Sequence, residues 1–197
     1  MNAGFLTDKA LDVLFREAHT ANGWLHGPVD EKILNDIYDL MKFGPTSANS
    51  CPLRIVFVKE DEGKARLKPF LDKGNVDKTM SAPVTAIFAY DTQFYNHLPL
   101  LFPHTDAKSW FIGNDRLIQE TAFRNSSLQA AYFIIAARAC GLDCAPMSGF
   151  DKEKLNAEFF PDGRYKANFI CALGYADPTK THKRNPRLAF DEVCSFV

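Results

Sequence analysis

The sequence predicts a single α+β domain, spanning residues 1–197, with one hydrophobic core. Three short runs rich in β-branched and aromatic residues, at 54–60, 82–91 and 167–176, are typical of buried strands. The segments around these runs carry apolar residues at helical spacing. No internal repeat, low-complexity stretch or linker separates the elements, so we expect them to pack together.

Two amphipathic helices are expected before the first strand. Residues 8–19 place four apolar side chains on one helical face, and residues 31–43 repeat apolar residues at i, i+4, i+7 and i+8. Asp30 is positioned to cap the second helix at its N-terminus. Gly44 and Pro45 are expected to end it.

Further helices are expected between and after the strands. Residues 61–73 have the pattern of a charged, exposed helix, and residues around 152–159 that of a short one. Residues 115–140 form the clearest helix, which is apolar around much of its circumference and therefore central, with Gly141 at its end. Residues 92–114 are aromatic, contain two prolines and lack a clear period. Two interpretations of that segment stay open, a functional lid and a helical excursion packed on the core.

The loop that follows Gly44 carries more small polar side chains than a turn requires. They are Pro45, Thr46, Ser47, Asn49 and Ser50. This surplus is understandable if the loop has two partners, its own backbone and a cofactor.

The C-terminus is unusually apolar. It ends with Leu188, Phe190, Val193, Phe196 and Val197 among its last ten residues. A terminus of this kind is usually docked, either on its own core or on that of another subunit.

Composition excludes several classes of function. Lys and Arg total 23 against 24 for Asp and Glu, so no excess of positive charge favours a nucleic-acid partner. No apolar run is long enough to span a membrane, and the N-terminus lacks a signal peptide, which predicts a cytoplasmic protein.

The odd number of cysteines, five, favours reduced and buried thiols, and no metal site is expected. The basic run at 180–187 is either a local anion site or a solvated loop.

The common catalytic motifs are absent. The sequence contains no Rossmann glycine fingerprint, no Walker A motif, no G-x-S-x-G elbow and no H-E-x-x-H helix. What remains is a set of polar loops at strand and helix ends, together with the basic C-terminal run. Such loops suit a flat, polar-edged cofactor with a phosphate, of which a flavin is one option among several.

Five motifs occur in order along the chain: "GPTSANSCPLRIVFV", "GNVDKTMSAPVTAIFAY", "FRNSSLQAAYFIIAARACGLD", "PMSGFD" and "NPRLAFDEV". Together they resemble the nitroreductase family of FMN-dependent oxidoreductases. The shorter stretches "NGW…PV", "FGPTSAN", "LPLLFPH", "SWF" and "ETAFRNSS" look closer still to its malonic semialdehyde reductase subgroup of pyrimidine degradation. The resemblance covers nearly the whole chain. It implies a central, mostly antiparallel sheet flanked by helices and a long central helix. It also implies a homodimer that exchanges C-terminal segments and holds FMN at its interface.

The resemblance implies FMN contacts from five groups of residues. They are the phosphate segment His19, Thr20 and Asn22; the polar loop with Pro45, Thr46, Ser47 and Asn49; the pyrimidine-edge pair Asn75 and Lys78; the N5 segment Pro146, Met147, Ser148 and Gly149; and the arginines Arg184 and Arg187. The family usually has Arg-Ser-x-Arg in the phosphate segment. This chain lacks both cations there, so the two arginines would carry most of the charge that faces the phosphate. Many relatives have Glu at the Ser148 position, where only the backbone N–H donor is retained.

The implied reaction is a ping-pong hydride transfer through flavin N5, and no side chain is assigned as catalytic. NADH or NADPH would reduce the flavin, and an oxidised substrate would then take its place. Malonic semialdehyde would give 3-hydroxypropionate, with Lys108, Arg116 or Arg124 facing the substrate carboxylate. Arg124 could equally form a buried structural network with Asn125. Two alternatives stay open, a broad nitro- or quinone reductase and a flavin-binding protein without turnover.

Overall fold

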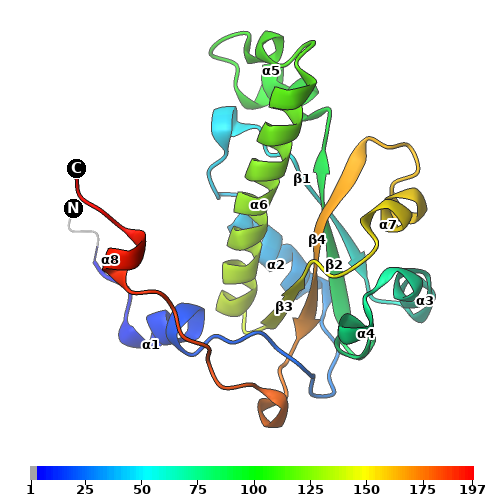
Figure 1. Ribbon diagram of the computed structural model, residues 1–197, viewed down its shortest axis with the longest axis vertical. Helices are drawn as coiled ribbons and strands as arrows, with labels where there is room; N and C mark the ends of the chain where they lie inside the picture. The colour runs from blue at the N-terminus through cyan, green and yellow to red at the C-terminus, as the bar shows by residue number, and fades with distance from the viewer. Residues whose placement is uncertain (1–3) are drawn as a thin grey trace.

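The computed structural model describes residues 4–197 and contains one antiparallel sheet of four strands in the order β1-β2-β4-β3 (Figure 1). The strands are β1 (Leu53–Val58), β2 (Val84–Asp91), β3 (Asp143–Met147) and β4 (Tyr165–Gly174). Three of them confirm the expected strands, whereas β3 was not expected. The predicted α+β fold class, with a mostly antiparallel sheet, is confirmed.

Helices connect the strands and flank the sheet. They are α1 (Asp8–Leu11), α2 (Glu31–Met41), α3 (Asp61–Leu67), α4 (Lys73–Met80), α5 (Leu98–Leu101), α6 (Asp115–Ala139), α7 (Lys152–Phe159) and α8 (Phe190–Val193). The long helix α6 and the short helix α7 confirm the predictions for 115–140 and 152–159. As expected, Gly141 follows α6 in a left-handed conformation, with φ of 83°, and its N–H donates to the Arg138 carbonyl at 3.0 Å.

Both faces of the sheet are covered. Side chains alternate along β2, so Val84, Ala86 and Phe88 face α2 and α6, while Ile87 and Ala89 face the opposite layer. That second layer consists of α3, α4 and α7 (Figure 1). These five side chains are all fully buried. The central strand therefore has a nearly continuous apolar sequence instead of an alternating one.

The inner face of α6 packs on the sheet through aromatic side chains. The ring of Phe133 meets that of Phe88 edge to face, with centroids 5.0 Å apart, and Phe88 in turn meets Phe169 at 4.9 Å. Such pairs contribute about 0.5–1.5 kcal/mol each beyond the area they bury. The outer face of α6 stays exposed and carries Phe123 and Leu128. The predicted central position therefore holds for one side of the helix only.

Residues 92–114 form a helical excursion with a small core of its own. It consists of the 3₁₀ turn Phe94–His97, α5 and the 3₁₀ turn Ala107–Trp110. Phe94, Leu98 and Phe111 are buried against the first turns of α6. The interpretation as a packed excursion is thus confirmed, and the structure does not test the interpretation as a lid.

Several element boundaries differ from the sequence prediction. The N-terminal helix is shorter than 8–19, because α1 is followed by a π-helical turn that ends at Arg16. Asp30 precedes α2, but its side chain makes no capping hydrogen bond. The helix expected over 61–73 ends at Leu67 and tightens into a 3₁₀ turn that contains Pro69, which cannot donate a helical hydrogen bond. Helix α4 was not predicted.

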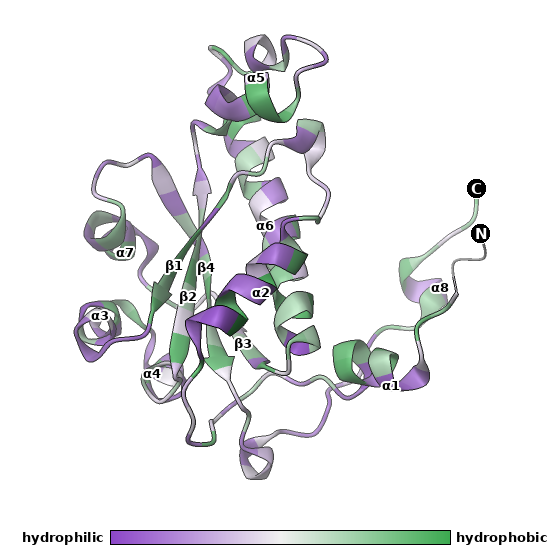
Figure 2. Cartoon of the chain, turned by 180° about the vertical axis from the view of Figure 1, so that it is seen from behind, coloured by the Kyte–Doolittle hydropathy of each residue, from purple (hydrophilic) through white to green (hydrophobic). Residues whose placement is uncertain are grey.

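The two chain ends stand away from the sheet. Figure 2 shows α1 on the side of α6 that faces away from the sheet and α8 farther out, with hydrophobic residues on both. Residues 181–197 are exposed throughout. The five cysteines are all free thiols; Cys144 and Cys171 are buried as expected, whereas Cys194 is exposed and contradicts that expectation. Within residues 4–197, no helix is both long and apolar enough to cross a membrane.

Candidate functional site

The predicted phosphate segment, residues 19–22, runs beside the edge strand β3. Thr20 forms a parallel bridge with Cys144, and the Ala21 N–H donates to the Cys144 carbonyl at 3.0 Å. A few residues on, the indole N–H of Trp24 donates to the backbone carbonyl of Lys78 in α4 at 2.7 Å. The phosphate segment is therefore held between the end of the sheet and α4.

The predicted N5 segment, residues 146–149, joins the same region. The side-chain amide of Asn75 donates to the Gly149 carbonyl at 2.9 Å, and the Asp72 N–H donates to that carbonyl at 3.1 Å. A Cβ at Gly149 would lie 2.6 Å from Asn75 Nδ2 and 2.7 Å from Asp72 Oδ2. Asn75 thus fixes the backbone of the N5 segment, and a larger residue at position 149 would displace the side chains of Asn75 and Asp72.

Two cations from the C-terminal basic run contact residues that flank the phosphate segment, one on each side of it. Arg184 Nη2 donates to the carbonyls of Arg16 at 2.7 Å and Ala18 at 2.8 Å. The side chain of Lys180 covers Gly23, where an added Cβ would lie 2.3 Å from Lys180 Cδ. Lys180 was not among the predicted site residues, although it begins the basic run that the sequence analysis singled out.

Arg187 does not lie with Arg184 and Lys180 beside the phosphate segment. Its guanidinium donates to the carbonyls of its own neighbours, Asn185 at 2.9 Å and Pro186 at 3.1 Å. The side chain is exposed. Of the two predicted arginines, the structure therefore brings only Arg184 to the phosphate segment.

The polar loop, residues 45–51, lies elsewhere. It packs beside the upper half of α6 in Figure 1, while the segment after α1 passes below β3. The Ser47 N–H donates to Asn125 Oδ1 at 2.8 Å, and Asn49 Nδ2 donates to the Leu101 carbonyl at 2.8 Å. Thr46 Oγ1 accepts from the Cys51 N–H at 3.2 Å. Within one chain, the polar loop is thus separate from the phosphate and N5 segments.

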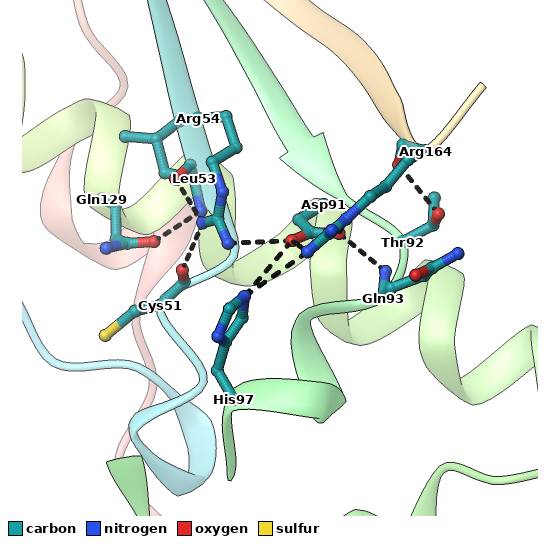
Figure 3. A network of polar contacts seen from close by, with 9 residues as sticks. All are labelled: Cys51, Leu53, Arg54, Asp91, Thr92, Gln93, His97, Gln129 and Arg164. Carbon is teal, nitrogen blue, oxygen red and sulfur yellow. Dashed lines mark hydrogen bonds and ion pairs between the residues drawn. The ribbon is translucent and has the colours of Figure 1, made fainter. Parts of the chain in front are cut away.

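A buried ion-pair network adjoins the polar loop (Figure 3). The carboxylate of Asp91 is fully buried and is held by Arg164 at 2.7 and 2.9 Å and by Arg54 at 2.8 Å. Arg54 also donates to the Cys51 carbonyl at 3.1 Å. The network therefore ties the end of the polar loop to the ends of β2 and β4. This network was not predicted, because Asp91 and Arg164 lie 73 residues apart in the sequence.

The three candidate substrate cations do not gather around the phosphate and N5 segments. Arg116 pairs with Glu120 on the surface of α6 at 2.8 Å, and Lys108 lies in the excursion. Arg124 is exposed on the outer face of α6, so it forms no buried network with Asn125, and that alternative is wrong. Asn125 itself is buried.

A cleft of about 780 Å³ runs along the free edge of β1. Its walls include apolar side chains of α2 and β1, namely Leu34, Met41, Leu53, Ile55 and Phe57. Strand β1 has only one neighbour in the sheet, β2, so the backbone groups on its other side have no strand partner within residues 4–197.

Comparison with known proteins decides the family. The sequence profile of the nitroreductase family matches residues 25–175. The chain belongs to the nitroreductase family. Relatives within it include a Ralstonia nicotianae protein, 57% identical with 98% of each chain covered, and a Polynucleobacter asymbioticus protein, 56% identical with 99% of this chain and 100% of the relative covered. Both carry the provisional name NADH dehydrogenase/NAD(P)H nitroreductase.

Solved structures show the nitroreductase fold. A nitroreductase-like protein of Exiguobacterium sibiricum, solved in complex with FMN, superposes with a TM-score of 0.86 at 18% identity, covering 98% of this chain and 99% of that one. A Staphylococcus epidermidis protein described as an NAD(P)H:FMN oxidoreductase superposes with a TM-score of 0.84 at 21% identity over the full length of both chains. At these identities the likeness establishes the fold of this nitroreductase-family chain and nothing finer.

Proposed function

We propose that this nitroreductase-family protein is an FMN-dependent NAD(P)H oxidoreductase. The observation that carries the proposal is the convergence of the phosphate segment, α4 and the N5 segment at one end of the sheet, with Arg184 and Lys180 beside them. Cations, free N–H groups and amides are the donors that a phosphorylated flavin requires.

The residues at this place fit FMN. Arg184 lies where a phosphate near residues 16–20 would need a cation, and it offers a guanidinium that phosphates favour. Lys78 is half-buried, and no carboxylate within residues 4–197 forms an ion pair with its ammonium group. The N–H groups of Ser148 and Gly149 make no hydrogen bond within the described chain, so they remain available as donors.

FMN, when bound, would supply a flavin N5 that accepts hydride from NADH or NADPH and passes it to a substrate. The chain's own residues would then do three things. Lys78 would stabilise negative charge on the pyrimidine edge, the backbone of Ser148 and Gly149 would donate toward N5, and Arg184 would hold the phosphate. Asn75 would act on the backbone of Gly149, to which its amide is already bonded.

The proposal includes a homodimer. The polar loop is remote from the other FMN-contacting segments in one chain, so a second chain would have to bring its own loop to them. The exposed tail, with Leu188, Phe190 and Phe196, offers apolar surface for exchange. The cleft beside β1 is an apolar acceptor next to an unpaired strand edge. An exchanged tail would cover both surfaces.

For the substrate, we propose malonic semialdehyde, with hydride transferred to its aldehyde carbon and a proton from water taken up by its oxygen to give 3-hydroxypropionate. The resemblance of the sequence to the malonic semialdehyde reductase subgroup supports this substrate. The alternative is a broad nitro- or quinone reductase, which the names of the relatives favour. A flavin-binding protein without turnover is the third possibility.

An anaerobic absorbance experiment distinguishes these functions. The purified protein is loaded with FMN, mixed with NADH or NADPH, and followed for bleaching of the flavin; malonic semialdehyde or a nitroarene is then added. Bleaching followed by reoxidation with the aldehyde is expected. Reoxidation by the nitroarene alone would select the broad reductase, and absence of bleaching would exclude both enzymes. Failure to bind FMN would overturn the whole proposal.

A further inference from the structure

The polar loop is held in a backbone conformation that its residues disfavour. Ala48 and Asn49 both have φ of 49°, and Cys51 has φ of 41°. Asparagine tolerates this left-handed region, but alanine and cysteine rarely adopt it. A loop with three such residues close together persists only when its surroundings hold it in place.

Two side chains of α6 hold the backbone on either side of the left-handed residues. Asn125 Oδ1 accepts the N–H of Ser47 at 2.8 Å, before the left-handed residues. Gln129 Oε1 accepts the N–H of Leu53 at 2.9 Å, after them (Figure 3 shows this second contact). Asn125 and Gln129 are one helical turn apart, so they face the loop together. Both side chains are buried, at 2% and 5% exposure.

The chemistry of these two side chains suits the task. Asn125 Nδ2 donates to the Thr121 carbonyl at 2.8 Å, which fixes the amide so that its oxygen points to the loop. A neutral amide oxygen can accept a hydrogen bond without burying a charge. The helix thus supplies two acceptors to backbone N–H groups of the loop and of the first residue of β1.

We propose that Asn125 and Gln129 are positioning residues that clamp the polar loop so that Ser47 is presented to FMN. The inference rests on the proposed function for the cofactor. Ser47 is exposed, and its hydroxyl makes no hydrogen bond within residues 4–197, whereas the side chains of Thr46 and Asn49 are already bonded inside the chain. Release of either end would let the left-handed residues relax and would turn Ser47 away.

A purely structural role is the competing explanation, and the chain offers a matched control for it. Asn168 on β4 is also buried against α6, where its amide donates to Ser126 Oγ at 3.0 Å and Ser127 Oγ at 2.9 Å. It does not contact the polar loop. Asn125→Leu and Asn168→Leu are therefore the same substitution in similarly buried sites on one helix interface, and only the first releases the loop.

The test measures FMN affinity, melting temperature and amide exchange in the full-length protein. We expect Asn125→Leu to raise the Kd for FMN by about tenfold, equivalent to about 1.4 kcal/mol. Exchange of the Ser47 N–H should accelerate by a similar factor in protein without added FMN. Asn168→Leu should lower the melting temperature but leave both the FMN Kd and the exchange at Ser47 close to the wild-type values.

The other end of the clamp gives a second variant. Gln129→Met keeps the length of the side chain and introduces no charge, but it removes the carbonyl acceptor. We expect Gln129→Met to weaken FMN binding and to speed exchange of the Leu53 N–H. If Asn125→Leu and Gln129→Met both match Asn168→Leu in FMN Kd, the clamp is wrong. A wild-type protein that binds no FMN would overturn the proposed function. The clamp is tested separately, because it is wrong if the Ser47 and Leu53 N–H groups exchange at wild-type rates in Asn125→Leu and Gln129→Met.

Discussion

Arg164 donates hydrogen bonds to both carboxylate oxygens of Asp91, from Nε at 2.9 Å to one and from Nη2 at 2.7 Å to the other. Asp91 is fully buried at the end of β2, whereas the side chain of Arg164 is 31% exposed at the start of β4. Arg54 adds a third contact from β1 at 2.8 Å. One carboxylate therefore joins three strands at the end of the sheet where the polar loop and the helical excursion both attach.

Replacing that carboxylate should destabilise the fold. In Asp91→Asn, two guanidinium groups lose their ionic partner, and we expect a loss of about 3 kcal/mol in the free energy of unfolding. Partial exposure of both arginines keeps the loss from being larger. Urea denaturation provides the measurement. Asp36→Asn is the control, because Asp36 pairs with Lys32 on an exposed helix face and its loss should change little. Equal effects of the two variants would contradict the prediction.

The same carboxylate should make stability depend on pH in the acid range. Burial raises the pKa of Asp91, but hydrogen bonds from Arg164 and the Gln93 N–H, with the charge of Arg54, outweigh it and hold the pKa below its ordinary value of 3.8. The unfolded chain therefore takes up this proton at a higher pH than the folded chain. The contribution is complete above the ordinary pKa and is lost as pH falls through the lower folded one.

The gap in unfolding free energy between the wild type and Asp91→Asn should accordingly be constant near neutral pH and narrow below about pH 4. Urea denaturation series on both proteins across this range would measure it. A gap that widens on acidification would mean that Asp91 is protonated more readily in the folded state, against the direction derived from its partners.

Some of this architecture was accessible from the sequence. The strands β1, β2 and β4 and the helix α6 were predicted because their apolar residues follow the period of each element over many positions. Strand β3 was missed because Pro146 interrupts it, and proline argues against a strand. As the edge strand, β3 has positions whose N–H groups point away from β4, where proline is tolerated.

Contacts between residues that lie far apart in the sequence could not be predicted. Asp91 and Arg164 carry no local pattern that would pair them, and the amides of Asn125 and Gln129 look like ordinary helix residues until the polar loop is placed beside them. The cofactor residues were suggested by resemblance to a family. In the structure, Arg184 lies beside the phosphate segment, whereas Arg187 and the polar loop lie apart from it.

The different positions of the two arginines lead to a prediction. Arg184→Ala should weaken FMN binding, because a charge-assisted hydrogen bond to the phosphate, worth about 1.5–3 kcal/mol, would be lost. That corresponds to a Kd raised about 10- to 150-fold, measurable by quenching of flavin fluorescence. Arg187→Ala is the matched control and should change the Kd much less. The opposite order would assign the phosphate to Arg187.

Two glycines near α4 give another matched pair. Gly149→Ala would force its Cβ against Asn75 and Asp72, break the contact between Asn75 and the Gly149 carbonyl, and shift the backbone of the N5 segment. We expect slower bleaching of FMN by NAD(P)H and weaker FMN binding. Gly74→Ala, in α4 itself, meets no atom within 4 Å and should stabilise the protein by about 0.5–1 kcal/mol without affecting bleaching. Normal bleaching in Gly149→Ala would remove the N5 segment from the proposed site.

The apolar tail provides the test of the dimer. Truncation after Arg187 removes Leu188, Phe190 and Phe196, which lie exposed in the single chain and have no other evident reason to be apolar. If each tail covers the cleft beside β1 of a partner, the truncated protein should have the mass of a monomer by light scattering. It should also lose FMN, because the polar loop of a second chain would no longer reach the phosphate and N5 segments. Asp191→Asn, which alters the charge of the tail but not its apolar surface, should remain dimeric. A truncated protein that stays dimeric and retains FMN would show that the tail is not exchanged and that the two chains associate through another surface.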